Sequence, residues 1–130
     1  MRQILFRGKT IDSGRWIKGY LVQGQWYYDD SPMTVIIPTD ITFYPRCEIS
    51  GYEDVDPETV GQWTGLVDKN DKKIFEGDIV ECWGRRVSVI YDIDYAEFEF
   101  DDIIELSLCV DYKECEVIGN KWDNPELLEE

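Results

Sequence analysis

The sequence has no histidine among its 130 residues. Imidazole is the side chain that most often carries a proton near neutral pH, so its absence excludes Ser–His–Asp and Cys–His catalysis. It also leaves only cysteine and carboxylate as ligands for a zinc ion. The four cysteines (Cys47, Cys82, Cys109 and Cys115) are scattered and contain no C-x-x-C pair. We therefore predict that the chain has no metal-binding residues.

Long apolar runs are also missing, because no stretch approaches the roughly 20 residues that a membrane-spanning helix needs. The amino-terminal stretch MRQILFRGKTIDSG has an apolar run of only three residues, which is too short for a signal peptide. We expect a soluble protein that stays in the cytoplasm of the cell that makes it. Four cysteines would suit two disulfides, but a core is feasible at this length without them. We therefore predict four free thiols, with Cys109 and Cys115 in a strand-like stretch.

Basic residues are scarce: 13 Lys and Arg stand against 28 Asp and Glu, which gives a formal net charge of −15. A chain this acidic neutralises few phosphates and is a poor nonspecific binder of nucleic acid. The charge is unevenly spread. Residues 1–20 carry five bases and a single acid, Asp12, whereas residues 88–118 carry ten acids and a single base, Lys113.

Aromatic residues are abundant, with five Trp, eight Tyr and five Phe. Aromatic and β-branched side chains suit a pleated sheet, and no long stretch shows the period of an amphipathic helix. The strand-like segments are 16–22, 25–28, 34–37, 41–44, 62–67, 73–75, 79–83, 87–91, 97–100, 106–110 and 117–120. The turns between them fall at 23–24, 29–32, 68–71, 76–78 and 84–86. Single helical turns are predicted at 56–59 and 124–128, where an Asp or Asn precedes a proline.

Short strands at close spacing predict a mainly β protein. We expect a small barrel-like core, SH3-like or related, with an amino-terminal hairpin layer and one or two short helical turns. Residues 60–83 should form a hairpin and the following strand of that core. Residues 1–130 form a single domain, with a potential division at Asp54-Val55-Asp56-Pro57 into sub-lobes 1–54 and 55–130.

Carboxylates are the one chemically active group that the sequence offers in quantity. The pairs at 92/94 and 97/99 each share a strand face, but a row of carboxylates on a wet face is ordinarily solvated. Nothing in the sequence separates their pKa values as acid–base catalysis requires. The stretch Asp68-Lys69-Asn70-Asp71 begins like a calcium loop, yet Lys73 and Ile79 occupy the positions that need Gly and an acid.

Bases lie beside aromatic residues in two places, Trp83 with Arg85-Arg86 and the stretch Arg15-Trp16-Ile17-Lys18. Nucleic-acid sites combine these residue types, but each place has only two bases among acidic neighbours. Charged residues at hairpin ends are common in soluble sheets, and we favour that interpretation for Arg85 and Arg86. We therefore predict no catalytic or cofactor-binding residues, no cofactor and no enzymatic activity.

Several short motifs, read together, resemble the YopX family of phage and prophage proteins. They are Phe6-Arg7-Gly8-Lys9, Trp16-Ile17-Lys18-Gly19-Tyr20, Val55-Asp56-Pro57-Glu58-Thr59-Val60-Gly61-Gln62-Trp63-Thr64-Gly65-Leu66, Asp68-Lys69-Asn70, Glu76-Gly77-Asp78-Ile79-Val80, Val117-Ile118-Gly119-Asn120 and Asn124-Pro125-Glu126-Leu127-Leu128. The sequence departs from the family pattern at Asp71, where Gly is usual. Asp tolerates the left-handed conformation less well than Gly, so we expect the turn to form at a modest cost. The resemblance implies a mostly β, oligomeric protein encoded by a phage or prophage, without catalytic residues to carry over.

Three classes of function remain. The first is a non-enzymatic accessory protein that acts through protein–protein contacts and self-assembly, with a host or phage partner in addition. The second is a nucleic-acid-related role, as a binding module or as an acidic mimic of DNA. The third, an enzyme using carboxylates and a metal, has no ligand motif to support it.

A self-assembling protein of this charge needs apolar burial, opposite charges, or both. The aromatic residues of the amino-terminal hairpin are Trp16, Tyr20, Trp26, Tyr27 and Tyr28, which belong either to the core or to an interface. For the charges, we predict that Arg2, Arg7, Lys9 or Arg15 lies near acids of residues 88–118 of another subunit.

Overall fold

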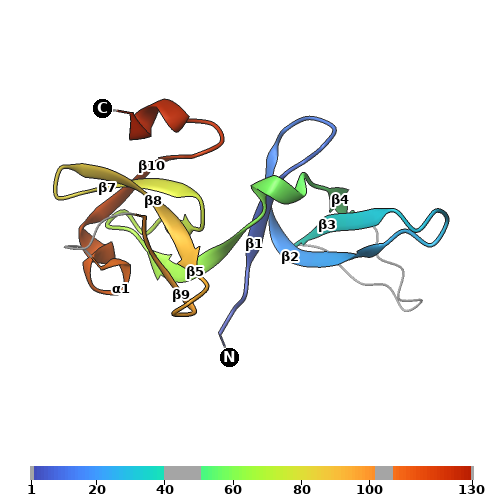
Figure 1. Ribbon diagram of the computed structural model, residues 1–130, viewed down its shortest axis with the longest axis horizontal. Coiled ribbons are helices and arrows are strands. Elements are labelled where there is room, and N and C mark those ends of the chain that lie inside the picture. Colours follow the sequence, from blue (N-terminus) through green and yellow to red (C-terminus); the bar gives the residue numbers. More distant parts are fainter. Residues whose placement is uncertain (1, 40–50, 102–106, 130) are drawn as a thin grey trace. The chain divides into compact units, whose positions relative to one another are not determined.

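The computed structural model describes residues 2–39, 51–101 and 107–129. Their strands form two antiparallel sheets (Figure 1), which confirms the mainly β prediction. Among these described residues, helix is limited to one α-helical turn and three 3-10 turns, more than the one or two turns predicted. No helix in the described part of the chain is long and apolar enough to cross a membrane.

The first sheet has the strand order β4-β3-β2-β1-β5-β6. Its strands are β1 (Phe6–Lys9), β2 (Trp16–Gln25), β3 (Pro32–Pro38), β4 (Glu53–Asp54), β5 (Gly61–Val67) and β6 (Lys73–Phe75). The second sheet has the order β10-β7-β8-β9. Its strands are β7 (Asp78–Cys82), β8 (Arg85–Asp92), β9 (Glu97–Phe100) and β10 (Cys115–Asn120). The helical turns are η1 (Pro57–Thr59), α1 (Leu108–Asp111), η2 (Tyr112–Glu114) and η3 (Pro125–Leu128).

The predicted barrel-like core needs correction, because the described residues form open sheets and no closed barrel. The second sheet ends at β10 on one side and at the four-residue strand β9 on the other. A barrel would require its two edge strands to pair, which these do not. The predicted hairpin within 60–83 is confirmed: β5 and β6 pair antiparallel and β7 follows.

The chain divides into two compact units, residues 1–62 and 63–130. The potential seam predicted from the sequence lies earlier, at 54/55. Backbone contacts explain why residues 55–62 belong with the first unit. The Asp56 N–H donates to the carbonyl of Lys9 (2.9 Å), and the Lys9 N–H donates to the Thr59 hydroxyl (2.9 Å).

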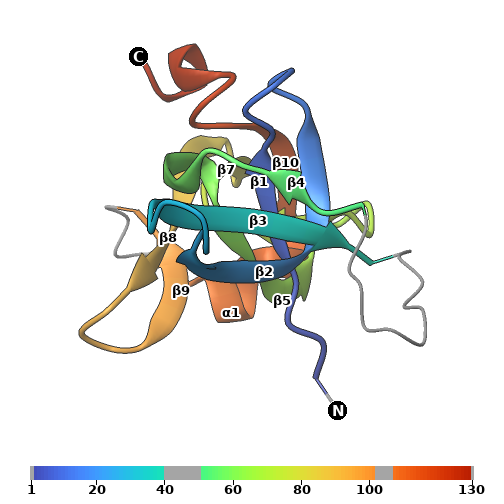
Figure 2. The same ribbon diagram turned by 90° about the vertical axis from the view of Figure 1, so that its right-hand side faces the viewer.

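The first unit is built on the long antiparallel pair of β2 and β3, which run side by side (Figure 2). Val35, Ile36 and Ile37 are all buried, so this short β-branched run supplies much of the unit's core. Gly19 permits the close approach of the two strands. A Cβ at Gly19 would lie 2.0 Å from the carbonyl oxygen of Ile37, which no side chain tolerates.

The second unit folds around a cluster of buried side chains from β6 to β10 and α1. The cluster consists of Ile74, Val80, Cys82, Val87, Val89, Phe100, Leu108 and Cys115. Alternation along the strands creates it, because successive residues of a strand point to opposite faces. In β9, Phe100 is buried while Glu97 is exposed, as the acid–aromatic alternation predicts.

The strand predicted at 25–28 is wrong: β2 continues to Gln25, through the turn expected at 23–24, and the chain then turns. The Trp26 N–H donates to the Ser31 carbonyl (2.9 Å). The Asp29 carboxylate accepts the Ser31 N–H (3.0 Å), and Asp30 has a left-handed φ of 58°. These local hydrogen bonds outweigh the strand preference of the aromatic residues.

Two further segments differ from prediction. Trp83 and Gly84 form the turn between β7 and β8, with φ of 55° and 77°, so Arg85 and Arg86 belong to β8 rather than to the turn. The segment predicted as a strand at 106–110 contains α1 instead, where the Asp111 carboxylate accepts the Ser107 N–H (2.8 Å). This bond favours a helical turn over continued alternation. Leu106 and the strand predicted at 41–44 lie outside the described residues.

One cap and two turns occur where the sequence predicts them. Asp56 caps η1, with its carboxylate accepting the Glu58 N–H (3.0 Å). Asp71 adopts a left-handed φ of 63° in the turn between β5 and β6, the conformation for which the family pattern uses Gly. The predicted carboxyl-terminal turn is η3, a 3-10 turn whose first residue is Pro125.

Candidate functional site

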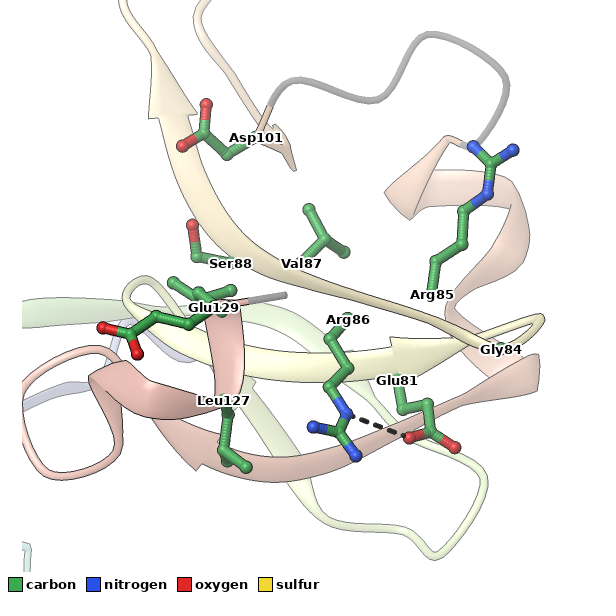
Figure 3. Close-up of a pocket in the computed structure, with 10 residues that line it drawn as sticks. Glu81, Gly84, Arg85, Arg86, Val87, Ser88, Asp101, Leu127 and Glu129 are labelled. Atoms are coloured by element: carbon green, nitrogen blue, oxygen red, sulfur yellow. Dashed lines mark ion pairs between the residues drawn. The ribbon is translucent and has the colours of Figure 1, made fainter.

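The second unit has an open groove of about 800 Å³ between the β7–β8 hairpin and η3 (Figure 3). Glu81 of β7 and Arg86 of β8 are cross-strand neighbours, and the Arg86 Nε lies 3.5 Å from the Glu81 carboxylate. Arg85 points away from Arg86, as expected for successive residues of a strand. The groove therefore presents a solvated ion pair instead of the cluster of bases that the sequence places at 85–86.

The groove does not assemble acid–base chemistry. Ser88 contributes a hydroxyl that is 7% exposed, but a serine nucleophile needs an adjacent base to activate it. Glu81 pairs with Arg86, and the other carboxylates of the lining belong to the exposed residues Asp101 and Glu129. The arrangement holds charge at a wet surface without separating the environments of two carboxylates.

Asp68, the first residue of the rejected calcium-like stretch, has a structural role. Its carboxylate accepts three backbone N–H groups, from Asn70 (2.8 Å), Lys72 (2.9 Å) and Val117 (2.8 Å). Burial opposes ionisation of Asp68, but these hydrogen bonds outweigh it and hold the pKa below its usual range. Among the residues that the structure describes, no three Cys, Asp or Glu side chains form a group that could hold a metal ion.

Of the acid pairs considered from the sequence, Glu97 and Glu99 lie two residues apart in β9, as predicted, whereas Asp94 lies beyond β8 in the turn of the β8–β9 hairpin. The Asp92 carboxylate accepts the N–H groups of Asp94 (2.9 Å) and Tyr95 (3.3 Å) and so closes the hairpin turn. Burial, then a hydrogen bond with Asp92 and the charges of Glu97 and Asp101, raise the pKa of Glu99. Asp92 lies opposite Glu97 in the register of β8 and β9, so the hairpin brings acids of the two pairs together, which was missed from the sequence.

The first unit exposes a cluster of four aromatic rings at the β2–β3 turn. We call Trp26, Tyr27, Tyr28 and Tyr52 the aromatic cluster. Trp26 stacks on Tyr28 (ring centroids 5.7 Å apart) and lies 6.1 Å from Tyr52, while Tyr27 meets Tyr28 edge to face (5.5 Å). The exposed fractions are 94% for Tyr27, 65% for Tyr28 and 42% for Tyr52. Desolvation, then the charges of Asp29 and Asp54, raise the pKa of Tyr28.

Tyr52 was not among the interface residues inferred from the sequence. It is far along the chain from the β2–β3 turn, and no local pattern signals their contact. Tyr52 also lines a small hollow of about 360 Å³ with Ile11, Asp12, Glu53 and Asp54. The aromatic cluster is therefore bordered by a polar recess.

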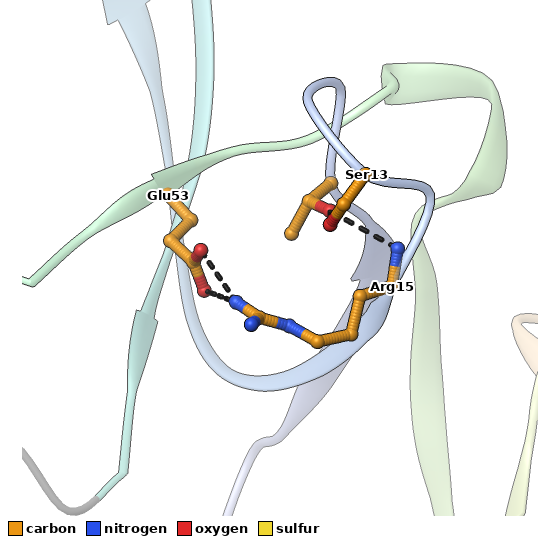
Figure 4. A network of polar contacts seen from close by, with 4 residues as sticks. Ser13, Arg15 and Glu53 are labelled. Atoms are coloured by element: carbon orange, nitrogen blue, oxygen red, sulfur yellow. Dashed lines mark hydrogen bonds and ion pairs between the residues drawn. The ribbon is translucent and has the colours of Figure 1, made fainter.

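A polar network holds the loop between β1 and β2 against β4 (Figure 4). The Arg15 guanidinium donates to both carboxylate oxygens of Glu53, at 2.5 and 2.6 Å. The Arg15 N–H donates to the Thr10 hydroxyl (3.1 Å), which also lies 3.0 Å from the Ser13 hydroxyl. Arg15 is thus engaged within its own chain, by Glu53, which also lines the hollow beside Tyr52.

The other amino-terminal bases differ in their exposure and in their contacts. Arg7 is 9% exposed and its guanidinium carbon lies 4.8 Å from the Trp16 ring centroid, while the Lys9 ammonium lies 5.6 Å from the same ring. Arg2 is exposed. Most of the bases predicted to meet acids of another subunit therefore make contacts inside the first unit, and the aromatic cluster becomes the stronger candidate for an interface.

The structure describes two of the four predicted thiols. Cys82 and Cys115 are free and buried in the core of the second unit, as predicted. Cys115 lies in β10, in agreement with its strand-like context, whereas Cys109 lies in α1. Cys47 and the side chain of Cys109 fall outside the described part of the chain.

Comparison with known proteins shows a family match and a solved structure of similar fold. A family model described as YopX protein matches residues 5–129. A solved structure, the crystal structure of protein EF1440 from Enterococcus faecalis, superposes with a TM-score of 0.64 and 27% sequence identity. That match covers 99% of this chain and 100% of the other. No curated protein matches. Neither matching description states an activity.

Proposed function

Because the chain belongs to the YopX family, with residues 5–129 matching, we propose that it is a non-enzymatic accessory protein that acts through self-assembly and other protein–protein contacts. We further propose that a phage or prophage encodes it and that it works in the cytoplasm of the bacterial host. The observation that supports self-assembly is the exposed aromatic cluster of the first unit.

The aromatic cluster has the properties of an association surface. Tyrosine and tryptophan are enriched in interfaces and supply large contact areas with few rotatable bonds. The rings of Trp26, Tyr27 and Tyr28 already contact one another, so ordering them costs little conformational entropy on binding. A side chain as exposed as Tyr27, at 94%, contributes little to the fold of its own chain.

Electrostatics favours the first unit over the second as the surface through which copies of this chain associate. Every copy carries a formal net charge of −15, which opposes association. The charge is concentrated in residues 63–130, with 19 acids and seven bases, whereas residues 1–62 carry nine acids and six bases. Copies that meet through their first units therefore encounter the least repulsion.

The carboxylates of the chain support a non-enzymatic role, because the buried and close ones serve the fold. Asp68 accepts three backbone N–H groups, and Asp92 closes the β8–β9 turn. Catalysis by carboxylates needs two such groups placed on either side of a substrate with separated pKa values. The groove beside η3 instead holds the ion pair of Glu81 and Arg86.

Paired substitutions test self-assembly through the aromatic cluster. Tyr27→Ser combined with Tyr28→Ser should lower the molar mass in solution to that of a monomer, with the circular dichroism spectrum unchanged. Tyr95→Ser is the matched control, because Tyr95 is 77% exposed but belongs to the second unit. Its molar mass should equal that of the wild type. Equal masses for all three proteins would contradict the proposal.

The β8–β9 hairpin favours a second candidate function, an acidic mimic of nucleic acid. It carries carboxylates at Asp92 of β8, Asp94 of the turn, and Glu97 and Glu99 of β9. Burial, then the hydrogen bond and charge of Asp92 and the charge of Glu97, raise the pKa of Glu99. Binding of a fluorescent Lys- and Arg-rich peptide at low salt, lost when 92, 94, 97 and 99 are changed to Asn or Gln, would support it. Equal binding by the neutralised variant would exclude this hairpin as the mimic.

A further inference from the structure

Two thiols of the second unit lie directly opposite each other on neighbouring strands. Cys82 is the last residue of β7 and pairs in register with Cys115, the first residue of β10. Both are buried, with exposed fractions of 1% and 0%. Both thiols donate to the same acceptor, the Asp111 carbonyl oxygen, at 3.8 Å from Cys82 and 3.3 Å from Cys115. The two sulfur atoms are therefore held on the same side of the sheet.

Backbone hydrogen bonding shows which kind of cross-strand pair they form. The Cys115 carbonyl accepts the N–H of Lys69, and the Cys115 N–H donates to the Tyr112 carbonyl, so neither bond goes to β7. The N–H and C=O of a strand residue point the same way, so the backbone polar groups of Cys115 face away from Cys82. Cys82 precedes the two-residue turn at Trp83 and Gly84 and pairs with Arg85 across it. The pair that closes such a hairpin exchanges backbone hydrogen bonds, so the backbone polar groups of Cys82 face β8 and point away from β10.

Cys82 and Cys115 are thus a non-hydrogen-bonded pair of an antiparallel ladder. In such a pair the Cα atoms are about 4.5 Å apart and the side chains approach closely. A disulfide needs Cα atoms roughly 4.4 to 6.8 Å apart, so this pair meets the requirement without a large backbone shift. We propose that Cys82 and Cys115 are a site of reversible oxidation that forms an intramolecular disulfide between β7 and β10.

The oxidant is a low-molecular-weight disulfide such as oxidised glutathione. The Cys82 thiolate attacks one sulfur of the oxidant, giving a mixed disulfide and releasing one thiolate of the oxidant. The Cys115 thiolate then attacks the Cys82 sulfur, closing the protein disulfide and releasing the second. Two protein sulfurs are oxidised, two oxidant sulfurs are reduced, and the two protein thiol protons pass to the released thiolates.

The environment indicates the order of the steps. Cys82 adjoins the turn that carries Trp83, whose side chain is 66% exposed, so a small opening of the hairpin end admits the oxidant. Burial, followed by a hydrogen bond with Cys82, raises the pKa of the Cys115 thiol and disfavours its thiolate. Cys82 is therefore the attacking residue and Cys115 the resolving residue. The inference does not rest on the proposed function.

The test is a redox titration of the full chain. The wild type is equilibrated with mixtures of reduced and oxidised glutathione, in native buffer and in denaturant, quenched, alkylated and mapped by mass spectrometry. We expect Cys82–Cys115 as the main linkage in native buffer, with an equilibrium constant roughly 30-fold or more above that of the unfolded chain. By linkage, the oxidised protein should melt at a higher temperature than the reduced protein.

Variants separate this pair from the other cysteines. A Cys47→Ser/Cys109→Ser variant should lose 2 Da on oxidation as the wild type does, whereas Cys82→Ser should form no linkage to Cys115. Alkylation of both thiols at every native glutathione ratio would overturn the proposal. So would linkages confined to Cys47 or Cys109, or a Cys82–Cys115 equilibrium constant no greater in native buffer than in denaturant.

Discussion

The two units of this chain differ in the exposure of their apolar residues and in their net charge. The first unit, residues 1–62, leaves the aromatic cluster exposed and carries nine acids against six bases. The second unit, residues 63–130, collects eight buried residues into a single cluster and carries 19 acids against seven bases. Large apolar side chains are exposed on both units, Tyr27 on the first and Tyr95 on the second among them. The smaller excess of acids on the first unit is what makes its aromatic cluster the proposed association surface.

Truncating a core residue in each unit should have the largest effect. Ile36 in the first unit and Ile74 in the second are both 0% exposed. Replacing either with Ala should lower the free energy of unfolding by about 2–5 kcal/mol, because it removes buried area and leaves a cavity. Denaturant titration measures this loss.

The same two variants show which unit carries self-association when their molar masses are measured under conditions where both stay folded. Ile36→Ala should weaken self-association, since β3 supports the strand pair that ends in the aromatic cluster. Ile74→Ala should leave association unchanged. Equal dissociation of both variants would contradict the assignment of self-association to the first unit.

Removing the Asp68 carboxylate should have an intermediate effect, confined to the second unit. Asp68→Asn cannot accept all three N–H groups that the carboxylate accepts, so we expect a loss of about 2 kcal/mol in the free energy of unfolding at pH 7. Asp94→Asn, at an exposed position, is the matched control and should change stability little.

The pH dependence of that loss follows from the lowered pKa of Asp68 in the folded state. The stabilisation is fully present above the pKa of the unfolded chain, near 3.9, and disappears as the pH falls through the lower folded pKa. Thermal melts of wild type and Asp68→Asn should therefore converge in strong acid. A difference in stability that stays constant from pH 7 to pH 2 would contradict this assignment.

The smallest effects are expected at two left-handed aspartates, one in each unit. Asp71 and Asp30 have φ of 63° and 58°, where Gly is less strained, so Asp71→Gly and Asp30→Gly should each stabilise by roughly 0.5 kcal/mol. Asp30→Gly also removes a negative charge next to the aromatic cluster. It should strengthen self-association slightly, as measured by sedimentation at several concentrations, whereas Asp71→Gly should not.

Local chemistry explains which parts of the fold the sequence predicts. The turn at 68–71 and the cap at Asp56 depend on nearby side chains, and they appear as expected. The strand predicted at 25–28 fails for the same reason, because Asp29, Asp30 and Ser31 form a turn whose hydrogen bonds outweigh aromatic propensity. The alternation at 106–110 likewise does not produce a strand, because the hydrogen bond from the Ser107 N–H to the Asp111 carboxylate favours a helical turn.

The candidate surfaces depend on contacts between segments far apart in sequence, and these could not be predicted. The sequence indicates that the aromatic residues of the first hairpin lie either in the core or at an interface. It does not show that Tyr52 joins Trp26, or that Arg7 is buried against Trp16. The opposition of Cys82 and Cys115 similarly follows from the register between β7 and β10, which no local pattern specifies.

The most direct test of the central claim is the molar mass of the wild-type protein by multi-angle light scattering at micromolar concentration, at low and at physiological salt. Apolar association through the weakly charged unit predicts a single species at a multiple of 15.3 kDa that is equally large or larger at physiological salt, because salt screens the repulsion between copies. A mass of 15.3 kDa at both salt concentrations would contradict the account.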